Sequence, residues 1–146
     1  MGIRAKDTDY AWAAGFIEAD GCSHLTVTGN CRASVIVVQR DKSALERVQR
    51  IFDTDYAIHV VTRGPRQYWR WTASGAKAEA VLLKILPYLE YKRSQAERAL
   101  ALLARRRLFP GKRGHGVKLS PDELAARLAI VHAERLSEQA PAVLAG

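Results

Sequence analysis

The 146-residue sequence lacks the features that mark membrane, secreted and disordered proteins. It contains no apolar run long enough to span a bilayer, and no basic stretch followed by an apolar one lies near its start. Cysteine is rare, because Cys22 and Cys31 are the only two, too few for a disulfide framework. Hydrophobic residues at 48% and charged residues at 26% are typical of one globular domain with a real core. We therefore expect an intracellular protein of the cytoplasm or nucleoid, not a secreted one.

Acidic residues are absent from three long stretches. No Asp or Glu occurs in residues 21–40, 56–78 or 98–121, and the formal net charge of the whole chain is +8. This excess of positive charge favours a polyanionic partner. Solvated basic loops are the alternative, so the interpretation depends on whether the acid-free stretches form one surface.

Two of the acid-free stretches are predicted to be β-hairpins. Apolar and polar residues alternate on both sides of the turn signals Gly29-Asn30 and Gly64-Pro65. Helical spacing of apolar residues predicts the other elements, with a break at Pro87. The expected order is a helix 8–20 capped by Thr8, strands 23–29 and 31–39, a helix 42–52, strands 56–63 and 66–74, helical segments on both sides of Pro87 within 75–103, and a last helix that starts at the capping box Ser120-Pro121-Asp122-Glu123 and ends near Ser137.

This order, αββαββα, predicts the α+β fold class. We expect a four-stranded antiparallel sheet covered by helices on one face, followed by a C-terminal helix. The predicted organisation is a main domain (1–104), a basic linker rich in Gly and Arg (105–119) and a C-terminal helical extension (120–146).

Strand alternation predicts which side chains point away from the helices. This exposed face would collect His24, Thr26, Thr28, Arg32 and Ser34 from the first hairpin and His59, Arg63, Arg66, Tyr68 and Arg70 from the second. The opposite face would hold Ile58, Val60, Trp69, Trp71 and Ala73. Two-stranded ribbons fit the major groove of B-DNA, and Arg, Thr and His suit contacts to phosphates and base edges. The sequence thus predicts that double-stranded DNA binds this face, with Arg40 at its margin.

Residues 13–21, "AAGFIEADG", resemble the LAGLIDADG signature of homing endonucleases. Two positions depart from it, since Ala13 stands where Leu is common and Glu18 replaces the first Asp. The stretch "VVQRD" resembles the family segment that carries a polar active-site residue, here Gln39. The stretch "LPYLEYKRSQA" resembles the Pro-x-Leu-x-x-Lys segment, with Lys92 at the lysine.

The resemblance covers about residues 8–103 and implies a metal-dependent DNA endonuclease, encoded by a mobile element or phage. It implies Mg²⁺, or Mn²⁺ in its place, at Asp20 and the backbone carbonyl of Ala19, which supply the oxygen ligands that hard cations prefer. Gln39 would position a water and Lys92 would offset phosphate charge. The implied reaction hydrolyses both strands of a duplex and leaves short 3′ overhangs.

The resemblance also implies a homodimer, because the motif helix packs against a second copy and this chain contains one motif. A two-fold axis would bring two Asp20 carboxylates together. Small residues at positions 11, 15 and 19 form a stripe that permits a close helix crossing. The interface is predicted to contain Ala11, Ala14, Gly15, Glu18 and Ala19, with Glu18 at the surface or in an ion pair between subunits.

Several alternatives remain open at this point. The chain could be a DNA-binding protein on the same scaffold that does not cut, either a transcription regulator or an intron-splicing factor. Cys22, His24 and Cys31 are three possible zinc ligands without a convincing fourth. Trp12 and the tryptophans of the second hairpin are interpreted as core residues, not as base-stacking groups. No membrane and no small-molecule cofactor are expected.

Overall fold

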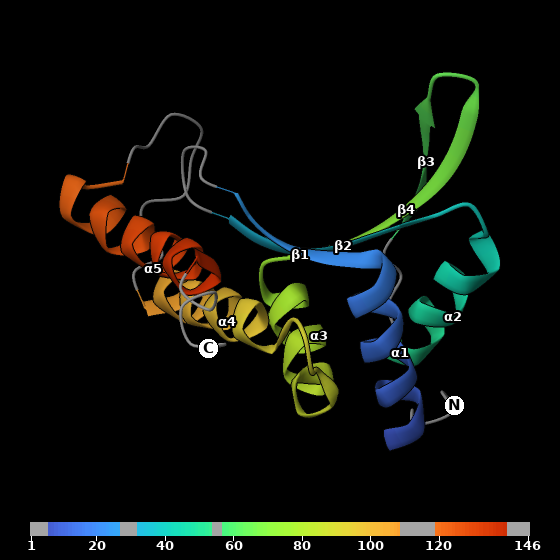
Figure 1. Ribbon diagram of the computed structural model, residues 1–146, viewed down its shortest axis with the longest axis horizontal. Coiled ribbons are helices and arrows are strands. Elements are labelled where there is room, and N and C mark those ends of the chain that lie inside the picture. Colours follow the sequence, from blue (N-terminus) through green and yellow to red (C-terminus); the bar gives the residue numbers. More distant parts are fainter. Residues whose placement is uncertain (1–5, 27–31, 54–56, 109–118, 140–146) are drawn as a thin grey trace, which may run out of the picture.

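The computed structural model describes residues 6–26, 32–53, 57–108 and 119–139, without the side chains of 20–26, 32 and 133–139. The α+β class is confirmed (Figure 1). The elements are α1 (Asp7–Asp20), β1 (Gly21–Thr26), β2 (Arg32–Gln39), α2 (Lys42–Phe52), β3 (Ile58–Arg63), β4 (Arg66–Ser74), α3 (Ala76–Ile85), the 3-10 turn η1 (Leu86–Tyr88), α4 (Arg93–Leu108) and α5 (Pro121–Gln139). In the described parts of the chain, no helix is both long and apolar enough to cross a bilayer.

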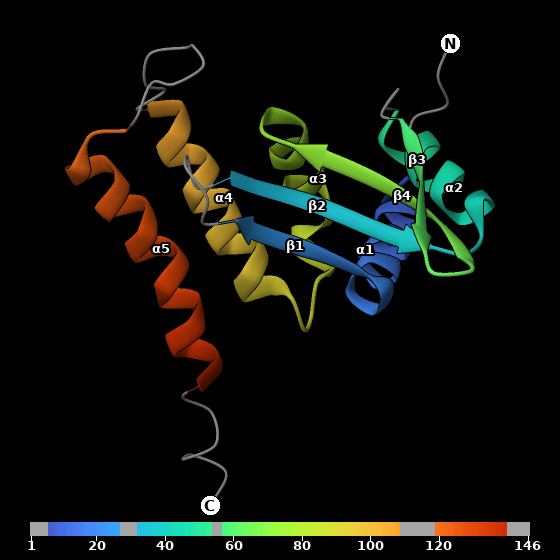
Figure 2. The ribbon, with the colours of Figure 1, turned by 90° about the horizontal axis from the view of Figure 1, so that it is seen from above.

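The strands form one antiparallel sheet in the order β1-β2-β4-β3. The central pair, β2 and β4, sets Val35 opposite Ala73 and Val37 opposite Trp71. Figure 2 looks down on the sheet, and no described helix crosses the face toward the viewer. One face of the sheet is therefore packed and the other is left for solvent or a partner.

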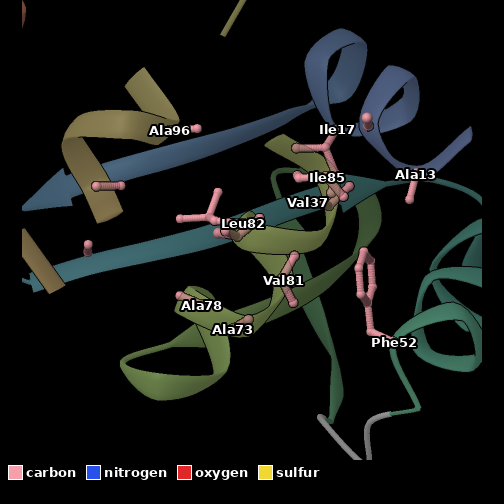
Figure 3. Packing of buried hydrophobic residues seen from close by; sticks show 14 of the residues in the cluster. Ala13, Ile17, Val37, Phe52, Ala73, Ala78, Val81, Leu82, Ile85 and Ala96 are labelled. Carbon is pink, nitrogen blue, oxygen red and sulfur yellow. The ribbon is translucent and has the colours of Figure 1, made fainter. Parts of the chain in front are cut away.

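The core lies between the packed face of the sheet and the helices (Figure 3). Every second residue of β2, from Ala33 to Val37, is fully buried, as the period of a strand requires. α2 contributes four buried apolar residues at helical spacing to this packed side of the sheet: Leu45, Val48, Ile51 and Phe52. Burying each large side chain contributes about 1.5–3 kcal/mol, so the cluster supplies the main stabilisation of this layer.

The three tryptophans take different positions in this core. Trp71 is fully buried, and its ring lies 6.2 Å from that of Phe52, so the prediction for Trp71 is confirmed. Trp12 and Trp69 are partly buried at the margin of the cluster. The guanidinium of Arg47 lies 3.8 Å from the Trp12 ring centre, and the ammonium of Lys42 lies 4.7 Å from that of Trp69. Aromatic faces at the edge of the core thus receive cations from α2.

The helix ends differ in part from the sequence expectation. α1 begins at Asp7, so Thr8 is not its cap; instead the carboxylate of Asp9 accepts the backbone N–H of Lys6 at 3.1 Å. The break expected at Pro87 is confirmed, because α3 ends at Ile85 and η1 follows. At α5 the hydroxyl of Ser120 accepts the N–H of Glu123 at 3.2 Å, as in a capping box.

The basic segment at residue 105 is not the start of a linker, because α4 continues through Leu108. Arg105 forms a bidentate pair with Glu123 of α5, with a shortest distance of 2.9 Å, and Arg107 pairs with Glu79 of α3. These arginines therefore tie helices together. Arg127, only 2% exposed, completes the contact by donating to Glu123 at 3.0 Å. The rest of the expected linker, 109–118, lies outside the described residues.

The Glu123 carboxylate makes the docking of α5 sensitive to acid. Hydrogen bonds from Arg105 and then Arg127 hold the pKa of Glu123 below its ordinary value of 4.5. A lowered pKa means that the stabilisation is present above the ordinary value and is lost as the pH falls through the folded value. We expect amide hydrogen exchange in α5 to accelerate below that pH relative to α2, after correction for the intrinsic rate. A Glu123→Gln variant should show the faster exchange already at neutral pH, and equal protection in both proteins would contradict this role.

Candidate nucleic-acid interface and cleavage site

The uncovered face of the second hairpin carries the cations that strand alternation predicted. The β3–β4 register pairs His59 with Arg70, Val61 with Tyr68 and Arg63 with Arg66. These positions alternate with buried Trp71 and so lie on the face away from the helices. The predicted placement of the His, Tyr and three Arg residues on one face is confirmed by this register.

The opposite face of the hairpin is less buried than predicted. Ile58, Val60 and Trp69 are on the helix side by register, yet Val60 is 47% exposed. The reason is visible in Figure 1, where the tip of this hairpin rises beyond the helices. The hairpin is thus an arm that projects from the packed layer.

Tyr68 is the centre of a cationic cluster on the uncovered face. The guanidinium carbons of Arg40 and Arg63 lie 5.7 and 6.0 Å from its ring centre. Hydrogen bonds from Arg40 and Arg66, together with the positive charge of Arg63, hold the pKa of the Tyr68 phenol below its ordinary value. In the described part of the chain, none of these three arginines forms an ion pair. The cluster therefore presents positive charge that is available to an anion.

The first hairpin is described only in part. Ser34 is half-buried and alternates with buried Ala33 and Val35, which puts it on the uncovered face. In the β1–β2 register His24 is the Cα partner of Ser34, and Thr26 that of Arg32. The side chains of His24, Thr26 and Arg32 lie outside the described part of the structure. Thr28 falls in the undescribed segment between β1 and β2, as does Cys31, so the zinc alternative is not tested.

Gln39 lies at the end of β2, on the helix side of the sheet. It pairs with Trp69 and continues the alternation of buried Val35 and Val37, but is itself half-buried. Arg40, the next residue, is exposed and reaches the ring of Tyr68. The strand end therefore directs one polar residue to each side.

The last turn of α1 meets the segment that precedes α4. Asp20 is the final residue of α1, and its side chain lies outside the described part. The Nζ of Lys92 donates to the carbonyl oxygen of Ile17 at 3.4 Å. The last four carbonyls of a helix lack intrahelical partners and carry partial negative charge. A lysine is stabilised there, and Lys92 is thereby held at the last turn of the helix that ends in Asp20.

Glu18 makes hydrogen bonds within its own chain that the sequence did not predict, and the expected ion pair between subunits stays a prediction. Its Oε1 accepts the backbone N–H groups of Glu90, Tyr91 and Lys92, at 2.5, 2.9 and 3.2 Å. These donors lie 72–74 residues further along the chain, so no local sequence pattern predicts these hydrogen bonds.

One side of α1 is exposed, and it contains the small residues predicted for a helix crossing. Ala11, Gly15 and Ala19 are exposed, and a Cβ added to Gly15 would meet no atom within 4 Å. Ala14, expected in the same interface, is instead fully buried in the core. An almost wholly apolar helix gives little sign of which small residues face inward, which is why Ala14 was assigned wrongly.

The oxygens at the end of α1 are of the kind that a hard divalent cation binds. The helix ends on an aspartate, and carbonyls of its last turn, such as that of Ala19, need partners outside the helix. Among the described residues, no group of three or more His, Cys, Asp or Glu side chains is placed to hold a metal.

No protein-family model matches the chain, and no curated protein matches it. Solved structures do. The chain is similar to the homing endonuclease I-CvuI in complex with the I-CreI target, with a TM-score of 0.56 and 21% identity over 86% of this chain and 96% of that one. It is similar to the homing endonuclease I-TnaI, with a TM-score of 0.58 and 17% identity over 93% of this chain and 96% of that one.

A third similar structure is the LAGLIDADG meganuclease I-CpaMI bound to uncleaved DNA, with a TM-score of 0.67 and 15% identity over 83% of this chain. The match covers only 42% of the I-CpaMI chain, in contrast to nearly all of I-CvuI and I-TnaI. At these identities the likeness concerns the fold, and it confirms the LAGLIDADG fold that the sequence resemblance implied.

Proposed function

We propose that this chain is a homodimeric, site-specific double-stranded DNA endonuclease of the LAGLIDADG type. The observation that carries the proposal is one continuous connection: α1 ends in Asp20 and leads directly into a sheet whose uncovered face carries the arginine cluster around Tyr68. A nuclease needs both parts, an anion-binding face that holds the duplex and oxygen ligands next to it. I-CvuI and I-CpaMI, which have this fold, were solved with DNA.

The uncovered face of the second hairpin is proposed to hold the DNA backbone and base edges. Because Arg66 and Arg70 are exposed on the projecting arm, each would contact a phosphate or a guanine edge. The same groove of the DNA would be contacted by His59, Arg63 and Tyr68 on this face. From the first hairpin, the proposal keeps His24, Thr26, Thr28, Arg32 and Ser34 as contacts.

Replacing Arg66 or Arg70 by Ala should weaken DNA binding and reduce its salt dependence. Each phosphate contact that is lost lowers the slope of log K against log salt by about one unit. The measurement is fluorescence anisotropy of a labelled duplex at several salt concentrations. Arg50→Ala, which removes an exposed arginine at the end of α2, is the matched control. A slope that is the same in all four proteins would mean that this face does not contact DNA.

A second copy of the chain is proposed to pack on the exposed side of α1. Gly15 supports this, since no intrachain contact requires a residue without a side chain there, whereas a close helix crossing does. The match to nearly all of I-CvuI but to less than half of I-CpaMI supports a chain that supplies one half of a two-fold site. The proposed interface contains Ala11, Gly15 and Ala19.

The chemistry is proposed to use Asp20 from each subunit and the carbonyl of Ala19 as ligands for Mg²⁺, or for Mn²⁺ in its place. Such a cation would supply charge neutralisation and an acidified water for phosphodiester hydrolysis. Lys92, held at the last turn of α1, would stabilise negative charge on the attacked phosphate. Gln39 would orient the attacking water from the end of β2.

The experiment that tests this function works without a known target site. A pool of supercoiled plasmids with random inserts, and a plasmid that carries the native region around the gene, are incubated with the protein and Mg²⁺. We expect linear DNA with short 3′ overhangs, and none when the cation is chelated. Binding without any cutting would overturn the enzyme and support the alternative of a non-cleaving regulator or splicing factor.

A further inference from the structure

We propose that Glu18 is a positioning residue, which sets the location of the Lys92 ammonium relative to the end of α1. The inference rests on the proposed function, because it concerns how a residue of that site is held. Glu18 does not contact the reacting atoms in this proposal. It acts through the backbone of the segment that carries Lys92.

The first part of the argument is the number of bonds made by one carboxylate oxygen. Oε1 of Glu18 accepts from Glu90, Tyr91 and Lys92, three successive N–H groups at 2.5–3.2 Å. These residues directly precede α4, so their N–H groups have no carbonyl partner within that helix. Hydrogen bonds to an ionised acceptor are roughly twice as strong as neutral ones. One side chain of α1 thus fixes the backbone of three residues.

The second part is a contact in the opposite direction. Lys92 donates from its Nζ to the carbonyl of Ile17, the residue before Glu18. The last turn of α1 therefore holds residue 92 at two points, by its N–H and by its ammonium. Two such attachments leave the side chain little freedom to move relative to Asp20.

The third part is the exposure of this segment. Leu89 is 5% exposed and anchors the segment to the core, but Tyr91 is 88% exposed. Without the Glu18 carboxylate, the N–H groups of residues 90–92 lose their common acceptor. The contacts that remain include the Lys92–Ile17 bond and the bonds from Arg93 to the carbonyls of Leu86 and Pro87, and none of these holds the backbone N–H groups. A catalytic group displaced by about 1 Å can lose about 100-fold in rate, so loss of this tie is expected to matter for cleavage.

The test is a double-mutant cycle with the plasmid recovered from the random pool. Glu18→Ala is expected to lower the single-turnover cleavage rate by about 10- to 100-fold, with the Kd for DNA unchanged within a factor of about two. Glu18→Gln, which keeps the length and an acceptor oxygen, should recover part of the rate. Amide hydrogen exchange at residues 90–92 should accelerate most in Glu18→Ala and less in Glu18→Gln. Glu97→Gln removes an exposed carboxylate of α4 and is the control.

The Lys92→Met background separates positioning from general stability. If Glu18 acts through Lys92, Glu18→Ala has almost no further effect on the rate once Lys92 is gone, because the two residues are coupled. Full additivity of the two losses, or an unchanged rate in Glu18→Ala, would overturn the inference while leaving the endonuclease intact. A protein that never cuts before any substitution would instead overturn the proposed function, and the inference with it.

Discussion

Replacing Asp20 by Asn is expected to abolish double-strand cleavage and to leave DNA binding intact or slightly tighter. The acid is the last residue of α1, where the negative end of the helix disfavours it, so stability alone does not explain its presence. In the proposed dimer, a divalent cation would compensate for the repulsion between two such carboxylates and between the helix ends. If the cation contributes about 4 kcal/mol to the transition state, the rate falls by about a thousandfold.

The measurement is single-turnover linearisation of the plasmid in Mg²⁺, together with anisotropy on the same duplex. Asp122→Asn, at the exposed start of α5, is the matched loss of one carboxylate and should cut normally. If the Asp20→Asn variant still cuts at the normal rate, Asp20 is not a metal ligand. If the variant no longer binds DNA, lost binding explains the loss of cleavage. The role of Asp20 as a metal ligand in the cleavage step is then also rejected.

Replacing Gly15 by Leu is expected to yield a folded monomer that does not cut. In the single chain a Cβ added at this exposed position would meet no atom within 4 Å, so a side chain can leave the helix there without a clash. Leu also has a higher helix propensity than Gly by nearly 1 kcal/mol, which favours α1 itself. Two helices that cross through small residues cannot accept two added Leu side chains without moving apart.

Sedimentation velocity and circular dichroism on the same samples test this prediction. Wild type should sediment as a dimer and the Gly15→Leu variant as a monomer with an unchanged helical spectrum. Ala101→Leu enlarges an exposed small residue of α4 and should remain dimeric and active. A Gly15→Leu variant that is still a dimer, or a wild type that is monomeric even on DNA, would contradict the interface on α1.

Local patterns predicted much of the fold. The alternation in "RQYWRWTAS" identified both faces of β4, since a strand with one packed side leaves little choice of register. The break at Pro87 followed from the missing N–H of proline. These features depend on neighbours in the sequence, which is why they could be derived without coordinates.

The features that were missed depend on partners far along the chain. Glu18 accepts from residues 90–92, and Arg105 pairs with Glu123, across separations that no periodicity encodes. The cluster at 105–107 looked like a linker because its acidic partners lie in other helices. Ala14 was misassigned for a related reason: burial of a small residue is decided by the tertiary neighbour.

The candidate site also contains features that the sequence predicted and features that it could not predict. Lys92 was selected through the resemblance of "LPYLEYKRSQA" to the family segment, and the structure brings it to the last turn of α1. The cluster of Arg40, Arg63 and Arg66 around Tyr68 was predicted only as membership of one face or its margin. That Arg40 reaches Tyr68 from the end of β2 could not be predicted, because it depends on how β2 and β4 lie side by side.

The most direct test of a two-fold endonuclease is to sequence the ends of DNA cut from the random plasmid pool in Mg²⁺. Two Asp20 residues related by a two-fold axis predict paired cuts on opposite strands, short 3′ overhangs, and a near-palindromic site centred between the cuts. DNA that is bound but never cut, or cut at sites with no two-fold symmetry, would contradict a homodimeric endonuclease.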